Sequence, residues 1–341
     1  MTGDEAPDEN EAITCIKSAE IEIAANYPIV SAYEFEFLKG EKVIRERLDN
    51  CTLYMIVQRP LTYFDNVRLT DTYLFFDIAD GANTPLPCRI NLVEAGVCEE
   101  GQVVDIQISF FSERSETPQQ PFRDVAAIQV YDKDDNFLVW WSPQKLLFEM
   151  LVNGLRVAVA GEQSPTAFVD FKVLYVGKAF DQKVWDRLTG HTKMQRLLTI
   201  QSPVGASPEA KAPFEICLVL LSVVGLSEHV EYFGTTYTLP EGVEPIFHVL
   251  EGDDEAVGRF VTEPLVKLGD TALTTEVEAM LINRFRPREN KILFDSYPNI
   301  AGGMRANGYS HSELSIERLP ARLTTDHCDW SALFVADDED D

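Results

Sequence analysis

The sequence has no long apolar run, no Cys-x-x-Cys pair and no glycine-rich phosphate loop that ends in Lys and Ser or Thr. A helix that crosses a bilayer needs about eighteen or more consecutive apolar residues, so no membrane span is expected. The six cysteines are scattered singly, which argues against a structural zinc site or a dense disulfide framework and fits a reducing cytoplasm. The acidic first ten residues also lack the pattern of a signal peptide, so we expect a cytoplasmic protein.

Positive charge is scarce. The chain has 29 Lys and Arg against 56 Asp and Glu, and a net charge of −27 repels a phosphate backbone. Two short segments depart from this balance, because residues 172–196 and 284–291 together hold ten basic and three acidic residues. One interpretation is a basic patch that faces phosphate on an otherwise acidic body. The alternative is chance clustering on two solvated helices.

The first part of the chain alternates between apolar and polar residues. From about residue 13 to 141, short runs with period two are separated by turn-forming stretches. Examples are Tyr33, Phe35 and Phe37, and later Val104 and Ile106. Strands with one wet face are typical of an antiparallel sandwich or barrel.

A helix is predicted after these strands. Ser142 is a suitable N-cap, Pro143 fits the first helical position, and Gly154 fits the stop. Further strands are expected at 171–176, 214–226 and 312–323, and helices at 185–198 and 276–285. The 341 residues therefore predict an α+β protein of two domains. The expected division is an acidic tail (1–12), a β-rich domain (13–142), a linking helix and connector (143–160), a second domain (161–325) with an insertion near 227–270, and an acidic tail (326–341).

Two segments of the second domain carry the strongest functional signal. The first reads Leu174-Tyr-Val-Gly-Lys178 and is followed by Arg187 and His191. The second reads Glu-x-x-Leu-Ile from Glu278, and Pro287 and Asn290 follow it. Together they resemble the two halves of the site in GIY-YIG nucleases. The resemblance implies a small sheet flanked by helices and a divalent-metal-dependent endonuclease, a phosphodiester hydrolase that uses Mg²⁺ or Mn²⁺.

The resemblance assigns a role to each matching residue. Tyr175 would assist proton transfer, Arg187 would stabilise charge on the phosphoryl group, and Glu278 would bind the metal. Pro287 and Asn290 would end the helix and brace the site. The predicted nucleic-acid contacts are Gly177, Lys178, Lys183, His191, Lys193, Arg284, Arg286, Arg288 and Asn290.

One feature departs from this family pattern, and another offers a different role for Glu278. The first element, Gly-Ile-Tyr, is expected shortly before Tyr175, but residues 161–171 contain no tyrosine. Thr275 and Glu278 also match a capping box, which would assign the carboxylate to helix initiation instead of metal binding.

The leading functional prediction is an endonuclease that acts on DNA, with the β-rich domain recognising a protein partner or a target. A catalytically degenerate scaffold that binds nucleic acid or protein is the first alternative. An acidic interaction protein is the second.

Overall fold

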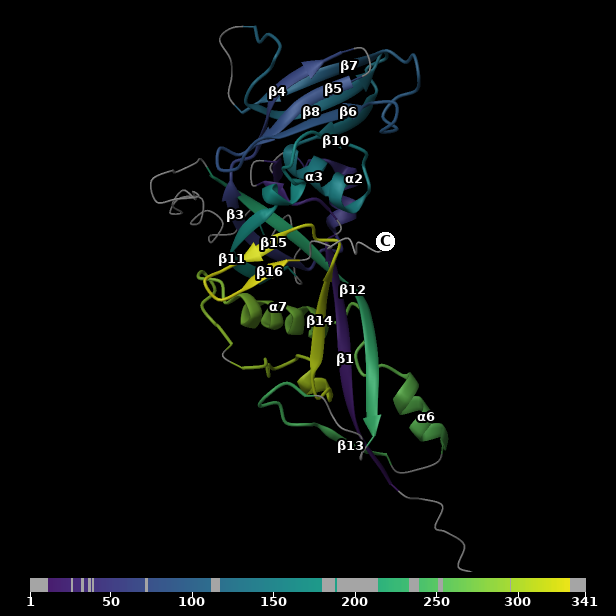
Figure 1. The fold of residues 1–341 in the computed structure, drawn as a ribbon. Coiled ribbons are helices and arrows are strands. Elements are labelled where there is room, and N and C mark those ends of the chain that lie inside the picture. Colours follow the sequence, from purple (N-terminus) through teal and green to yellow (C-terminus); the bar gives the residue numbers. More distant parts are fainter. Residues whose placement is uncertain are drawn as a thin grey trace, which may run out of the picture.

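The computed structural model describes residues 12–25, 27–31, 34–35, 38, 40–70, 73–111, 117–179, 188, 214–232, 239–250, 254–294 and 296–331. These residues form a mixed α+β fold in which strands dominate, arranged as two sheets with few helices (Figure 1). No helix in the described part of the chain is long and apolar enough to cross a bilayer.

The larger sheet has nine strands among the described residues, in the order β13-β1-β12-β3-β11-β15-β16, with β14 beside β1 and β2 beside β12. The strands are β1 (Ile13–Ala25), β2 (Val30–Ser31), β3 (Leu53–Pro60), β11 (Asp170–Lys178), β12 (Phe214–Tyr232), β13 (Phe247–Leu250), β14 (Ser312–Glu317), β15 (Arg322–Thr324) and β16 (Asp329–Ser331). The central strand β3 and the first half of β12 are buried on both faces, which explains their nearly continuous apolar sequences.

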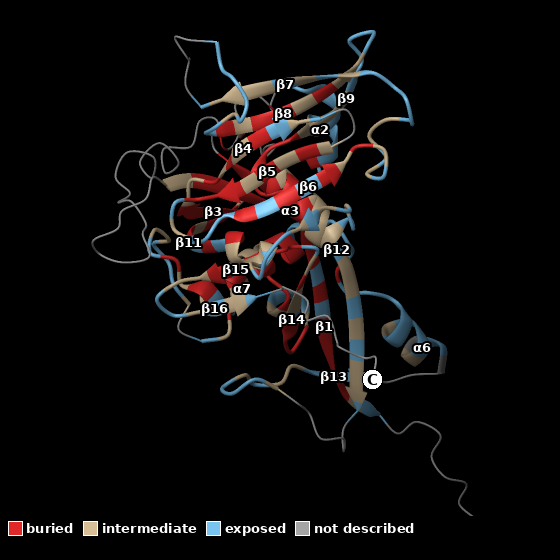
Figure 2. Ribbon diagram, turned by 45° about the horizontal axis from the view of Figure 1, so that its top comes forward, coloured by how far each residue is buried: buried red, intermediate tan, exposed pale blue. Residues whose placement is uncertain are grey.

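The second sheet has seven strands in the described residues, in the order β10-β6-β5-β4-β8-β7, with β9 beside β8. Its strands are β4 (Tyr63–Leu69), β5 (Tyr73–Ala79), β6 (Leu86–Asn91), β7 (Val104–Phe110), β8 (Val125–Asp132), β9 (Phe137–Trp141) and β10 (Ala158–Val159). Buried and more exposed residues alternate along β5 and β6 (Figure 2). One face therefore packs on the core and the other is wet, as the period-two pattern predicted.

The predicted helix after these strands is confirmed as α3 (Pro143–Val152). The Ser142 hydroxyl accepts a hydrogen bond from the Lys145 amide at 3.3 Å, and Gly154 has φ +70° just beyond the end. Leu146 and Leu147 belong to a buried core that both sheets share, and α3 lies between the sheets (Figure 1).

The remaining helical segments lie around the large sheet. They are α2 (Lys42–Leu48), α6 (Asp254–Thr262), α7 (Thr271–Phe285) and the short 3-10 turns η1 (Pro165–Phe168) and η2 (Arg305–Asn307). β1 and β12 extend beyond the main body, and β13 and α6 lie at the far end of this extension (Figure 1).

The strand pairing does not follow the division expected from the sequence. β1 and β3, expected in the first domain, pair with β12, and β3 also pairs with β11. The second sheet occupies residues 63–159, between β3 and β11, which are neighbours in the large sheet. It is therefore an insertion between two adjacent antiparallel strands.

One predicted strand is wrong. Glu34 and Phe35 are helical, although the alternation around Phe35 predicted a strand. The Ser31 amide donates to the Glu34 carboxylate at 2.8 Å, and the Glu34 amide donates to the Ser31 hydroxyl at 3.1 Å. This reciprocal capping box starts a helical turn and overrides the alternation. The other two residues of the pattern, Tyr33 and Phe37, lie outside the described residues.

Candidate functional site

The end of β11 and the helix α7 meet at an ion pair. Lys178 Nζ lies 2.9 Å from Glu278 Oε2 and donates to the Thr275 hydroxyl at 3.3 Å. The Lys178 and Glu278 side chains are 34% and 22% exposed, so the pair can be reached from solvent. α7 buries Val277, Leu281 and its other apolar residues against the sheet. The two sequence segments that carry the family resemblance therefore converge in space.

Helix α7 starts earlier than the sequence predicted. It begins at Thr271, with Asp270 at the N-cap position, so Thr275 lies inside the helix and cannot cap it. The capping-box alternative for Glu278 is wrong, because a cap must stand where the helix begins. The carboxylate contacts Lys178 instead.

Gly177 is required by the close approach of two tyrosine rings. A Cβ atom at this position would lie 2.7 Å from Tyr175 Cε1 and 2.7 Å from the hydroxyl of Tyr54. Gly177 pairs directly with Tyr54 across β11 and β3, and the two ring centroids are 6.1 Å apart. The space that the glycine leaves is thus filled by phenol rings, whereas the sequence analysis predicted a contact with nucleic acid at Gly177.

Tyr54 is the residue that sequence reasoning missed. Its side chain is buried, and it lies near the start of β3, in the run Thr52-Leu-Tyr54. The signal was a tyrosine at the start of an apolar strand. Tyr54 lies 121 residues before Tyr175, so the short spacing expected for the first family element did not point to it.

Asn290 fixes the outer edge of β11. The Val176 amide donates to Asn290 Oδ1 at 2.9 Å, and Asn290 Nδ2 donates to the Val176 carbonyl at 2.8 Å. The Glu289 amide also donates to the Leu174 carbonyl at 3.1 Å. The side-chain amide thus takes the place of a neighbouring strand and is engaged with the backbone.

The three arginines after Glu278 lie in different surroundings. The Arg284 guanidinium lies 5.7 Å from the ring centroid of Trp330, and Arg286 Nη2 donates to the Phe294 carbonyl at 3.4 Å. Arg288 is exposed, with Nε 3.6 Å from a carboxylate oxygen of Glu289. The predicted residues Lys183, Arg187, His191 and Lys193 lie outside the described residues, as does the predicted helix 185–198 apart from the buried Leu188.

A cavity of about 400 Å³ opens at the start of α7. Thr52 and Thr274 line it, and the Thr274 hydroxyl donates to the Thr52 hydroxyl at 3.3 Å. Asp270 and Leu273 at the start of α7 complete part of the wall. Thr274 precedes Glu278 by one helical turn, so the cavity and the carboxylate lie on the same side of α7.

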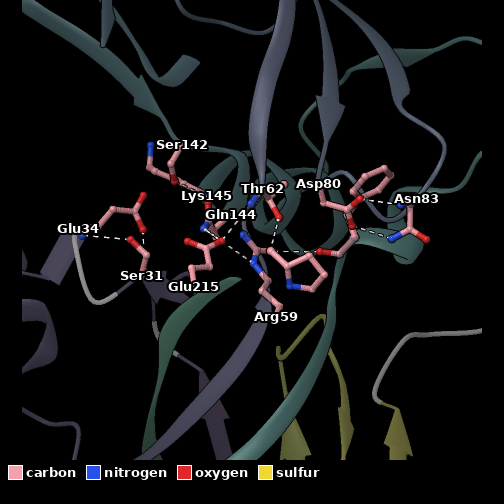
Figure 3. A network of polar contacts seen from close by, with 12 residues as sticks. Ser31, Glu34, Arg59, Thr62, Asp80, Asn83, Ser142, Gln144, Lys145 and Glu215 are labelled. Carbon is pink, nitrogen blue, oxygen red and sulfur yellow. Dashed lines mark hydrogen bonds and ion pairs between the residues drawn. The ribbon is translucent and has the colours of Figure 1, made fainter. Parts of the chain in front are cut away.

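A second polar cluster lies between the two sheets (Figure 3). Arg59 Nε donates to Glu215 Oε1 at 2.8 Å, and Gln144 Nε2 donates to the same oxygen at 2.8 Å. Burial raises the pKa of Glu215, and the nearby Arg59 opposes that rise. The cavity beside this cluster measures only about 10 Å³, roughly one water molecule. The cluster therefore ties α3 to the large sheet and leaves no space for a substrate.

Within the described residues, no three His, Cys, Asp or Glu side chains gather into a cluster that could hold a metal. Glu278 is the carboxylate that the two converging segments supply. Comparisons of the chain with models of protein families, with curated proteins and with solved structures found no match.

Proposed function

We propose that this chain is a divalent-metal-dependent endonuclease that hydrolyses phosphodiester bonds of nucleic acid, with DNA as the leading substrate. The observation that carries the proposal is the contact between Lys178 and Glu278 at 2.9 Å. It joins the two segments that resemble GIY-YIG nucleases although about one hundred residues separate them in the sequence.

In this proposal, Tyr54 supplies the tyrosine that the resemblance expects from the first family element. It lies on β3, the antiparallel neighbour of β11, and faces Tyr175 across Gly177. A phenol hydroxyl can both donate and accept a hydrogen bond, and in its ionised form either tyrosine can take the proton from an attacking water. The seven-stranded sheet would then be an insertion between the first and second family elements.

Glu278 fits a Mg²⁺ or Mn²⁺ ion. Mg²⁺ is usually held by one or two carboxylates together with water and substrate phosphates, so the single, partly exposed carboxylate of Glu278 is a suitable donor. A bound ion would stabilise the negative charge that builds on the phosphoryl oxygens. Lys178, which now neutralises Glu278, has an ammonium group that can contact a phosphate oxygen instead.

The cavity beside Thr52 and Thr274 supports a substrate of nucleotide size. Pockets that bind small molecules usually measure about 300–1,000 Å³, and this cavity measures about 400 Å³. In the proposal, it holds one nucleotide next to the bond that is cleaved. Arg187, outside the described residues, keeps its predicted role in stabilising phosphoryl charge.

The test is cleavage of plasmid DNA by the purified chain with Mg²⁺ or Mn²⁺. Glu278→Gln should abolish cleavage, whereas Glu263→Gln, the same change at an exposed position on the far side of the fold, should leave it intact. Tyr54→Phe and Tyr175→Phe keep both rings beside Gly177 and remove one hydroxyl each. If Tyr54 or Tyr175 takes the proton, removal of that hydroxyl should lower the rate of cleavage roughly a hundredfold or more.

A non-catalytic nucleic-acid-binding scaffold is the second candidate. The observation that favours it is the same ion pair, because Lys178 already neutralises the Glu278 carboxylate. A scaffold would bind DNA with a steep dependence on salt and would not cut it with either metal. That result, or full cleavage by Glu278→Gln, contradicts the endonuclease proposal.

A further inference from the structure

The wet face of the seven-stranded sheet carries two arginines and two aromatic residues side by side. Phe75 on β5 pairs with Arg68 on β4 and with Arg89 on β6, so these three side chains share one face. Tyr73 lies two residues before Phe75 and therefore belongs to the same face. The residues between them, such as Leu74, are buried in the core.

These four side chains form a continuous stacked row. The Arg68 guanidinium lies 5.7 Å from the Phe75 ring centroid, and the Arg89 guanidinium lies 5.1 Å from the Tyr73 ring centroid. The centroids of the two rings are 6.0 Å apart, and the ring planes are tilted by 40°. Both arginines are exposed. We call this row the Arg–aromatic face.

The charge of this face is unusual for the molecule. The side chains of Arg68 and Arg89 make no ion pair or hydrogen bond with the described part of the chain, although acidic residues outnumber basic ones by 56 to 29. The nearest carboxylates along the same strands already have partners. Asp65 lies 3.8 Å from Arg123, and Asp77 accepts a hydrogen bond from Asn66 at 2.6 Å. Two guanidinium groups therefore remain available to an anion.

We propose that the Arg–aromatic face binds single-stranded nucleic acid. Exposed bases stack on aromatic rings and on guanidinium planes, and the phosphates between the bases attract the positive charge. Bases in a duplex are already stacked on one another, so the face should favour a single strand. An acidic peptide would satisfy the arginines but has no flat groups to stack on the row.

The proposal goes beyond the nuclease proposal and does not depend on it. The second sheet follows β3 at Pro60, whereas Tyr54 lies near the opposite end of that strand. At about 3.3 Å per residue, the two ends are on the order of 20 Å apart. A strand bound at the Arg–aromatic face would thus contact the protein at a place separate from the Lys178–Glu278 pair.

Fluorescence anisotropy with a labelled oligodeoxythymidine and a labelled duplex tests the proposal, in EDTA so that metal-dependent cleavage cannot occur. We expect the full chain to bind the single strand more tightly than the duplex. Arg68→Gln/Arg89→Gln should weaken that binding about tenfold or more, and should lower the salt slope by about 1.4, because each phosphate contact on a single strand contributes about 0.7. The control Arg45→Gln/Arg259→Gln removes the same charge from exposed positions on α2 and α6 and should bind as the parent does.

A second variant separates stacking from charge. Tyr73→Leu/Phe75→Leu keeps apolar bulk on β5 and should also weaken single-strand binding about tenfold. Equal affinity for single strand and duplex, or equal affinity in the arginine variant and its control, would overturn the proposal. The anisotropy is measured in EDTA and reports binding alone, so a failure of the cleavage test leaves this result independent.

Discussion

Replacement of Asn290 by alanine tests whether the segment after α7 holds β11 in place. The Asn290 side chain donates one hydrogen bond to the Val176 backbone and accepts another, at 2.8 and 2.9 Å. Val176 is buried and lies directly before Gly177. Water therefore cannot readily replace the lost amide, and the variant leaves a backbone donor and a backbone acceptor without these partners.

The expected loss of stability follows from these two hydrogen bonds. Each net hydrogen bond contributes about 1 kcal/mol, and an unsatisfied buried group costs about 1–3 kcal/mol, so the variant should lose about 2–4 kcal/mol in total. Unfolding entropy for a chain of 341 residues then converts this loss into a drop in Tm of roughly 3–6 °C. Asn290→Asp should also be destabilised, because its second carboxylate oxygen would face the Val176 carbonyl.

Thermal unfolding and amide hydrogen exchange measure the effect together. The Val176 amide should exchange faster in Asn290→Ala, because its acceptor is gone. Asn153→Ala is the matched control, since Asn153 is exposed at the end of α3. If Asn290→Ala melts at the same temperature as this control and keeps the Val176 amide protected, the bracing role is refuted.

The features that the sequence predicted well are those with local signals. The helix from Pro143 is marked by its cap and by Gly154, which are adjacent to it in the chain. The strands of the second sheet show period two because one face of each is wet. The family resemblance predicted that the segments around Tyr175 and Glu278 lie together, and the structure joins them through Lys178 and Glu278, a pair that the sequence did not predict.

The position of Tyr54 could not be predicted from local signals. Its partner strand β11 follows only after the seven-stranded sheet, and no residue in β3 marks which distant strand will pair with it. The cost of closing a loop grows slowly with its length, so a long insertion between paired strands is tolerated. Distance along the chain was therefore a poor guide to which residues lie beside Tyr175.

The capping boxes show why a local motif needs its context. Ser31 and Glu34 form a real box, with both reciprocal hydrogen bonds. Thr275 and Glu278 have the same spacing, yet they lie within α7. Ala272 and Leu273 are buried, and their packing extends the helix upstream of Thr275. Tertiary burial, which the motif does not contain, decides where the helix begins.

Two further predictions concern buried charges. Lys17 is fully buried, and its Nζ lies 2.6 Å from Glu228 and donates to the carbonyls of Phe260 in α6 and of Glu263 just after it. Lys17→Met should therefore destabilise the chain by about 3–5 kcal/mol in urea unfolding, because it leaves the Glu228 carboxylate without its cation. Lys17→Met/Glu228→Met should recover part of this loss, because the carboxylate is removed as well. An equal loss in the single and double variants would contradict this account. Burial raises the pKa of Glu276 above its usual 4.5, although hydrogen bonds from Met304 and Tyr297 oppose the rise. The folded state then binds more protons than the unfolded state, so the stability that this carboxyl contributes is present at low pH and is lost as the pH rises through its raised pKa. Glu276→Gln carries no titrating group at this position, so its unfolding free energy relative to the parent should increase from about pH 4.5 upward. If the difference in unfolding free energy between variant and parent stays constant with pH, this account of Glu276 is wrong.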